Sequence, residues 1–155
     1  MEKITIDDLD NWMAPATVKR PVGSELDAEH LSMNYYELAP GESFAFGYHA
    51  HGDQEEIFYV IEGTATFETE TGDVDVESGE VIRFSPGEFQ RGTNETDETV
   101  RAIAVGAPAD AGELTLLREC ESCGERTEQT IEPTDDGEAL VTLCVGCGTE
   151  TGRFS

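Results

Sequence analysis

Two histidines and two glutamates lie close together near the first third of the chain. His49 and His51 are one residue apart, and Glu55 and Glu56 follow after three intervening residues. Two imidazoles and one carboxylate, with coordination positions left open, suit Fe(II), Mn(II), Ni(II) or Zn(II). This spacing predicts a mononuclear site for a divalent transition metal. The alternative is that the histidines are only a polar lining inside a barrel.

The residues before the histidines indicate a pocket beside them. A strand over 41–51 would alternate its side chains between two faces, so His49 and His51 would project to the same side. Small residues share that side and aromatic residues take the other: Ser43, Ala45 and Gly47 against Phe44, Phe46 and Tyr48. The small residues are expected to leave a cavity. A second strand that begins at Glu55 and Glu56 can fold back beside the first.

All four cysteines lie near the C-terminus, in two Cys-x2-Cys-Gly units: Cys120 with Cys123, and Cys144 with Cys147. This spacing is typical of a zinc ribbon. Four thiolates complete a tetrahedral ion and leave no open position, so the predicted zinc is structural. Two redox dithiols or two disulfides are the alternatives. The segments flanking 134–137, which ends in Asp-Gly, are expected to pair as a hairpin.

Short apolar segments with turn signals between them predict the elements that position these groups. They recur from residue 31 to residue 105, a rhythm typical of an antiparallel sandwich or barrel. A run of small residues then breaks the rhythm and is expected to be a connector. We therefore expect an all-β chain in four parts: an N-terminal arm (1–29), a barrel (30–106), a linker (107–112) and a zinc ribbon (113–155).

The chain is strongly acidic. Its 34 Asp and Glu residues against 9 Lys and Arg give a formal net charge of −25, and only Lys3 and Lys19 are lysines. The acidic residues are spread between hydrophobic runs, which favours a folded domain with an acidic surface. Such a surface suits a salt-rich cytoplasm, because a Debye length of about 3 Å at 1 M salt screens the repulsion. We take this as the hypothesis that the protein is halophilic.

The expected cellular location rests on two features that the sequence lacks. No segment reaches the roughly 18 apolar residues of a membrane span, and the first residues have no apolar signal stretch. We expect a cytoplasmic protein without a membrane partner, in which cysteines are ligands more often than disulfides.

The central segments resemble the two motifs of the cupin superfamily. In the first, G-x5-H-x-H-x3-4-E-x6-G, the matching residues are His49, His51, Glu56 and Gly63; Glu55 also fits the variable spacing, but only Glu56 keeps six residues before the glycine. The leading glycine departs from the pattern by two places.

The second motif, G-x5-P-x-G-x2-H-x3-N, resembles residues 79–94. Gln90 stands where the family has its third histidine, and Asn94 falls at the terminal asparagine. A glutamine amide oxygen can bind a metal, more weakly than imidazole, or can hydrogen-bond a metal-bound water.

The resemblance implies a double-stranded β-helix, or jelly-roll barrel, of a small single-domain cupin. With its zinc ribbon the chain resembles haloarchaeal cupin proteins. The implied ligands of the barrel metal are His49, His51, Glu56 and Gln90. Further candidates for the pocket lining are Tyr36, Glu55, Phe58, Val60, Arg83 and Phe89. Arg83 could pair with an anionic substrate, with a surface salt bridge as the alternative.

Two functions remain open. The first is a cupin that binds a small polar metabolite at its metal, with dioxygenase, isomerase or hydrolase chemistry unassigned. The second is a non-catalytic sensor of a metal or metabolite whose ribbon docks a protein partner. Residues 113–155 contain ten acidic residues and only three arginines, so we expect no nucleic-acid partner. The resemblance also implies a homodimer.

Overall fold

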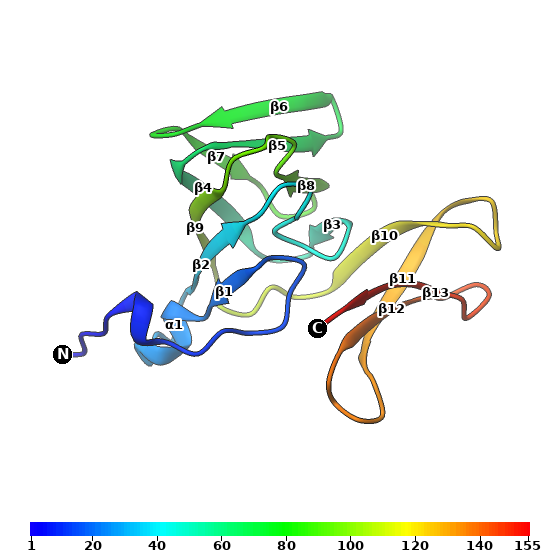
Figure 1. Cartoon of the computed structure of the whole chain (residues 1–155), viewed down its shortest axis with the longest axis horizontal. Helices are drawn as coiled ribbons and strands as arrows, with labels where there is room; N and C mark the ends of the chain where they lie inside the picture. Colours follow the sequence, from blue (N-terminus) through cyan, green and yellow to red (C-terminus); the bar gives the residue numbers. More distant parts are fainter.

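Antiparallel strands make up most of the chain. The computed structural model describes residues 1–155, and the strands form two sheets (Figure 1). The first sheet has the order β1 (Val18–Arg20), β2 (Ser32–Leu38), β9 (Val100–Ala107), β4 (Glu55–Glu62) and β7 (Val81–Phe84). The second has the order β13 (Glu150–Phe154), β12 (Leu140–Cys144), β11 (Glu125–Pro133), β10 (Leu114–Cys120), β3 (Tyr48–His51), β8 (Gln90–Thr93), β5 (Thr64–Thr69) and β6 (Gly72–Glu77). The all-β expectation is confirmed.

Helix is confined to the first residues. It consists of the 3-10 turn η1 (Ile6–Asp8) and the four-residue helix α1 (Val22–Glu25). Neither element has the length and apolar character of a membrane-crossing helix.

The barrel core lies between the two sheets and is rich in aromatic residues. Alternation places one face of each strand inward; in β9, for example, every second residue from Val100 to Gly106 is buried. The inward residues of β9 are small, which leaves room for larger rings from the strands around it. Phe58 packs with its ring centroid 5.0 Å from that of Phe67 and 5.1 Å from that of Phe44.

The segment before the histidines differs from the strand expected over 41–51. Only Tyr48–His51 is a regular strand, and the preceding residues bend. The predicted alternation is therefore wrong there, since Phe44 turns into the aromatic core. Gly47 is small for another reason: a Cβ at this position would lie 2.6 Å from the carbonyl oxygen of Leu117, so glycine lets β10 approach.

The second strand also takes a different place from the one expected. β4 does not pair with β3; it crosses to the other sheet and pairs with β7 and β9. Glu56 consequently faces the histidine strand across the barrel interior, and does not lie beside it within one sheet.

Residues 113–155, here termed the C-terminal module, continue the second sheet. β10 pairs with β3 through its first residues and with β11 through its last ones, so one strand belongs to both parts, as the chain path in Figure 1 shows. The expected hairpin is confirmed: β11 pairs with β12, and Gly137 adopts φ 72° in the turn between them.

Candidate metal centre and its pocket

Three predicted ligands meet inside the barrel. His49 and His51 extend from β3 and Glu56 from β4, and their ligand atoms all lie within 4.8 Å of one another. His49 is buried, while the other two side chains are half-buried. The cluster therefore combines donors from both sheets at the edge of the aromatic core.

The backbone hydrogen bond of His49 sets which of its ring nitrogens can bind a metal. Its Nδ1 lies 3.0 Å from the carbonyl oxygen of Gly47. A carbonyl can only accept, so Nδ1 carries the proton and Nε2 offers a lone pair to the cluster. Burial lowers the pKa of His49, which also favours the neutral ring that binds metals. A backbone carbonyl that fixes the ring in this way is common behind metal-binding histidines.

His51 and Glu56 approach each other without a hydrogen bond. Nε2 of His51 lies 3.2 Å from Oε2 of Glu56, yet this carboxylate oxygen and Nδ1 of His51 are both buried without a hydrogen-bond partner. Leaving buried polar atoms unsatisfied costs about 1–3 kcal/mol each. A cation between the two side chains would satisfy the carboxylate oxygen, so the donor set fits a divalent metal ion.

Gln90 is the fourth member of the cluster. It lies opposite His49 in the pairing of β3 with β8 and is 2% exposed. Its amide nitrogen lies 3.3 Å from Nε2 of His49, and its Oε1 is buried without a partner. Rotation of the amide would turn this oxygen toward the cluster, which is how Gln90 could ligate a metal.

The cluster opens into a cavity of about 240 Å³. Tyr36 and Phe58, both predicted to line it, do so. Burial, followed by the charge of Glu56, raises the pKa of Tyr36, so its hydroxyl stays protonated. Among the small residues expected to leave the space, Ala45 lines the cavity, whereas Ser43 is buried and donates its hydroxyl to backbone carbonyls.

Four other predicted lining residues lie elsewhere. Glu55 and Arg83 form an ion pair of 2.7 Å outside the cavity, because Glu55 alternates with Glu56 along β4. Val60 has no exposed surface and lies deeper in the core than Phe58. Phe89 packs against Tyr48, with 5.3 Å between ring centroids.

Sequence reasoning missed much of the pocket wall. Lys19 of β1, Asn34 of β2 and Gln54 line it from outside the two motifs. The C-terminal module also contributes an apolar side, formed by Leu114, Leu116 and Ile131. Only Lys19 carried a signal in the sequence, as one of two lysines in so acidic a chain.

The four cysteines form a second cluster at one end of the module. Their sulfur atoms lie within 4.8 Å of one another. Sγ of Cys120 is 3.5 Å from that of Cys147, and Sγ of Cys123 is 3.8 Å from that of Cys144. Ligands about 2.3 Å from a tetrahedral ion are about 3.8 Å apart, and a disulfide would need about 2.05 Å. This spacing fits one metal ion and not two disulfides.

Hydroxyl groups support the thiolates of the second Cys-x2-Cys unit. Thr127, with its Oγ1 3.1 Å from Sγ of Cys144, is the main cause that lowers the pKa of Cys144 to about 6. Thr149, with its Oγ1 3.2 Å from Sγ of Cys147, is the main cause that lowers the pKa of that cysteine. A lowered thiol pKa favours the thiolate form, which is the form that binds metals.

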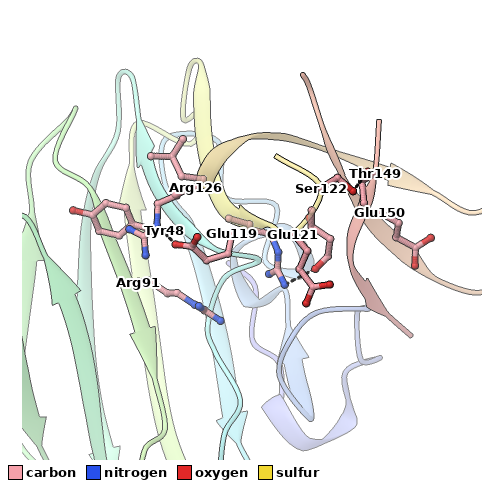
Figure 2. Close-up of a pocket in the computed structure, with 11 residues that line it drawn as sticks. Tyr48, Arg91, Glu119, Glu121, Ser122, Arg126, Thr149 and Glu150 are labelled. Atoms are coloured by element: carbon pink, nitrogen blue, oxygen red, sulfur yellow. Dashed lines mark hydrogen bonds and ion pairs between the residues drawn. The ribbon is translucent and has the colours of Figure 1, made fainter. Parts of the chain in front are cut away.

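Arginines fasten the module to the barrel around a second cavity (Figure 2). Arg118 donates to the carbonyl oxygens of Phe46 in the barrel and Thr151 in the module. Arg126 forms a 2.9 Å ion pair with Glu68 of β5, and its guanidinium lies 4.8 Å from the ring centroid of Tyr48. Three glutamates share this cavity with the arginines, so we assign it a structural role.

Comparison with known families agrees with this architecture. A family model described as the cupin domain matches residues 34–106. This part of the chain, which holds all four residues of the candidate metal centre, is therefore a cupin domain of the jelly-roll type. A comparison with curated protein sequences finds no match.

Solved structures support the same fold at low sequence identity. A cupin-superfamily sugar phosphate isomerase from Silicibacter pomeroyi is 18% identical, with 99% of this chain and 92% of that chain covered and a TM-score of 0.62. The polyketide cyclase RemF from Streptomyces resistomycificus is 22% identical, with coverages of 78% and 88% and a TM-score of 0.65. A predicted oxalate decarboxylase from Thermotoga maritima is 18% identical, with coverages of 69% and 99% and a TM-score of 0.60. The three differ in their described reactions, so the likeness concerns the fold alone.

Proposed function

We propose that this protein is a metal-dependent cupin that binds a small polar metabolite at a mononuclear centre. His49, His51 and Glu56 would hold the ion, with Gln90 as a weak fourth ligand. The observation that carries the proposal is the convergence of ligand atoms from His49, His51 and Glu56 within 4.8 Å of one another beside a cavity, with the Oε2 atom of Glu56 buried and without a hydrogen-bond partner. Such atoms are costly unless a cation or ligand satisfies them.

The chemistry at this centre depends on the ion. Fe(II) would supply oxygen activation, and Mn(II), Ni(II) or Zn(II) would supply Lewis-acid chemistry of the kind used in isomerisation or hydrolysis. The residues around the centre would control water access and the state of its ligands. The aromatic core excludes water from one side, and the carbonyl oxygen of Gly47 fixes the tautomer of His49. Dioxygenase, isomerase and hydrolase activity each belong within this proposal.

Titration of the metal-free protein with Co(II) tests where ions bind. Cobalt at thiolates gives an intense near-ultraviolet charge-transfer band, whereas cobalt at nitrogen and oxygen ligands gives only weak visible bands. We expect both signatures in the wild type, with the weak bands lost in His49→Ala and the intense band lost in Cys123→Ser. Weak bands that persist unchanged in His49→Ala would contradict the assignment of the barrel centre.

For the C-terminal module we propose a zinc ribbon with one structural Zn(II) at the four cysteines. The support is the tetrahedral spacing of the sulfur atoms and the hydroxyl contacts at Cys144 and Cys147. The division into arm, barrel, linker and ribbon remains part of this proposal, with β10 shared between barrel and ribbon.

The alternative function is a non-catalytic sensor whose ribbon docks a protein partner. Two observations favour it: Gln90 replaces an imidazole, and Val145 in the second Cys-x2-Cys unit is 59% exposed. An exposed apolar residue on a metal-stabilised turn is a suitable contact for a partner. Affinity capture with wild type and Val145→Glu, both zinc-loaded, tests this function. Loss of one defined partner in the variant is expected, and an identical set of captured proteins would contradict docking there.

We also propose a halophilic, cytoplasmic homodimer. The net charge of −25 supports the first property, and the unpaired cysteines suit a reducing compartment. Full stability in salt-free buffer would contradict the halophilic proposal, and a monomeric mass by light scattering in high salt would contradict the dimer.

A further inference from the structure

Lys19 is the one lysine in the wall of the barrel pocket, which contains no arginine. It extends from β1, where it pairs with Tyr36 of β2, and it lines the cavity together with His49, His51 and Glu56. Its Nζ lies 5.9 Å from the centroid of the Tyr36 ring. The N-terminal arm therefore brings a positive charge to the candidate metal centre.

Apart from the ring of Tyr36, the ammonium group of Lys19 has no partner within the protein. It forms no hydrogen bond, and no carboxylate oxygen lies within ion-pair distance of it, whereas five of the seven arginines have such a partner. The chain contains 34 acidic residues, and none of them pairs with Lys19. Burial lowers the pKa of Lys19, against a smaller opposing effect from the charge of Glu56. The fold thus holds a partly desolvated cation open toward the cavity.

The rest of the wall defines what could pair with this cation. Asn34 and Gln54 offer polar groups, and Leu114, Leu116 and Ile131 of the C-terminal module form an apolar side. The volume of about 240 Å³ is below the range of about 300–1,000 Å³ typical of pockets for drug-sized ligands. A ligand that fits is small, with one anionic end and an apolar body.

A carboxylate fits this wall better than a phosphate. Phosphate groups are usually held by several donors, often by the fork of an arginine, and no arginine lines this cavity. A single ammonium is sufficient for one carboxylate. Within the cavity Lys19 and Glu56 balance in charge, so a divalent ion at the centre would leave a net positive pocket suited to an anion.

We propose that the barrel pocket binds a small carboxylic acid with an apolar body, and that the ammonium group of Lys19 holds its carboxylate. This inference rests on the proposed metal centre, whose ion would contact the same ligand from the other side of the cavity. Lys19 is a binding residue in this account, and the apolar residues of the module select for the body of the ligand.

The test uses butyrate and its neutral analogue butyramide as probes, in one constant high-salt buffer. Binding is measured by saturation-transfer NMR on metal-loaded wild type, Lys19→Met, Lys19→Arg and the matched control Lys3→Met, which alters the other, exposed lysine. Butyrate is expected to bind wild type and Lys3→Met equally. Affinity should fall about 10- to 100-fold in Lys19→Met, in keeping with loss of a charged hydrogen bond, and recover in part in Lys19→Arg. Butyramide should bind all four proteins weakly.

Three results would overturn the inference: no binding of butyrate to wild type, equal affinity in Lys19→Met, or equal affinity for butyramide. Metal content, measured on the same samples, separates this failure from that of the proposed function. Suppose that the barrel ion is present in Lys19→Met and absent from His49→Ala, and that butyrate binds Lys19→Met as tightly as wild type. This result would reject only the carboxylate site. Absence of a barrel ion from wild type would reject the metal centre itself.

Discussion

Leu116 of β10 lies directly opposite His49 of β3 in the antiparallel pairing of the second sheet. Leu116 is 2% exposed and also lines the barrel pocket. Four residues further along the same strand, Cys120 joins the four-cysteine cluster. One continuous strand therefore connects the two candidate metal sites. β10 forms part of the barrel wall through its pairing with β3, and its far end is held by its pairing with β11.

Loss of the ion from the module should loosen the histidine strand. In Cys120→Ser we expect faster hydrogen exchange of the amides in 48–51, because their partners on β10 lose the support of the folded module. Exchange in β5 and β6, at the other end of the sheet, should change little. Ser122→Ala is the matched control, since it lies in the same Cys-x2-Cys unit and keeps all four thiolates. Unchanged exchange in 48–51 of the zinc-free variant would show that the two sites are independent.

Truncation of Leu116 should be costly because the side chain is buried between the pocket and the module. We expect Leu116→Ala to lower the free energy of unfolding by about 2–5 kcal/mol, as for other buried leucines. Leu114→Ala, at a position 42% exposed on the same strand, should cost much less. Urea unfolding of both variants at constant salt measures the difference. Equal costs would mean that β10 does not seal the barrel.

Two substitutions of Gln90 should change the affinity of the barrel for its ion in opposite directions: alanine should lower it and histidine should raise it. Gln90→Ala removes the proposed fourth ligand and should reduce affinity about 10- to 100-fold, the range found when supporting groups of a metal site are removed. Gln90→His supplies a third imidazole and should raise affinity above that of wild type. Competition with a chelator measures both changes. The same affinity in all three proteins would leave Gln90 a structural residue.

Lys19→Met should stabilise the protein while it weakens ligand binding. Burial without an ion pair is unfavourable for the charged form of Lys19, so methionine should raise the free energy of unfolding by about 0.5–2 kcal/mol, as stabilising substitutions commonly do. Wild type should gain stability as pH rises toward the ordinary lysine pKa of 10.5, because the unfolded chain then holds a proton that the folded chain releases more readily. The advantage of the variant should shrink over that range. Thermal unfolding between neutral and alkaline pH tests this; a destabilised variant would indicate a structural role for Lys19.

The sequence motifs predicted the residues that meet at the candidate metal centre better than they predicted the wall of its pocket. His49, His51 and Glu56 follow one another closely in the chain, so their convergence required only a turn between two strands. The surroundings depend on residues far apart in the sequence: Lys19 comes from the arm and Leu116 from the module, and no local pattern links either to the histidines. Phe44 shows a further limit, because bends before β3 break the alternation on which its predicted face depended.

The metal content of the protein is the decisive test of the proposed barrel centre. Wild type and His49→Ala, both purified in high salt without a metal-affinity tag, would be analysed by plasma mass spectrometry for the identity and number of ions per chain. We predict two ions per chain in wild type, one of them zinc at the cysteines, and loss of the other ion alone in His49→Ala. The identity of that second ion would distinguish oxygen chemistry from Lewis-acid chemistry. A single zinc in both proteins would contradict the proposed barrel centre, since it would mean a filled ribbon and a barrel that holds no metal.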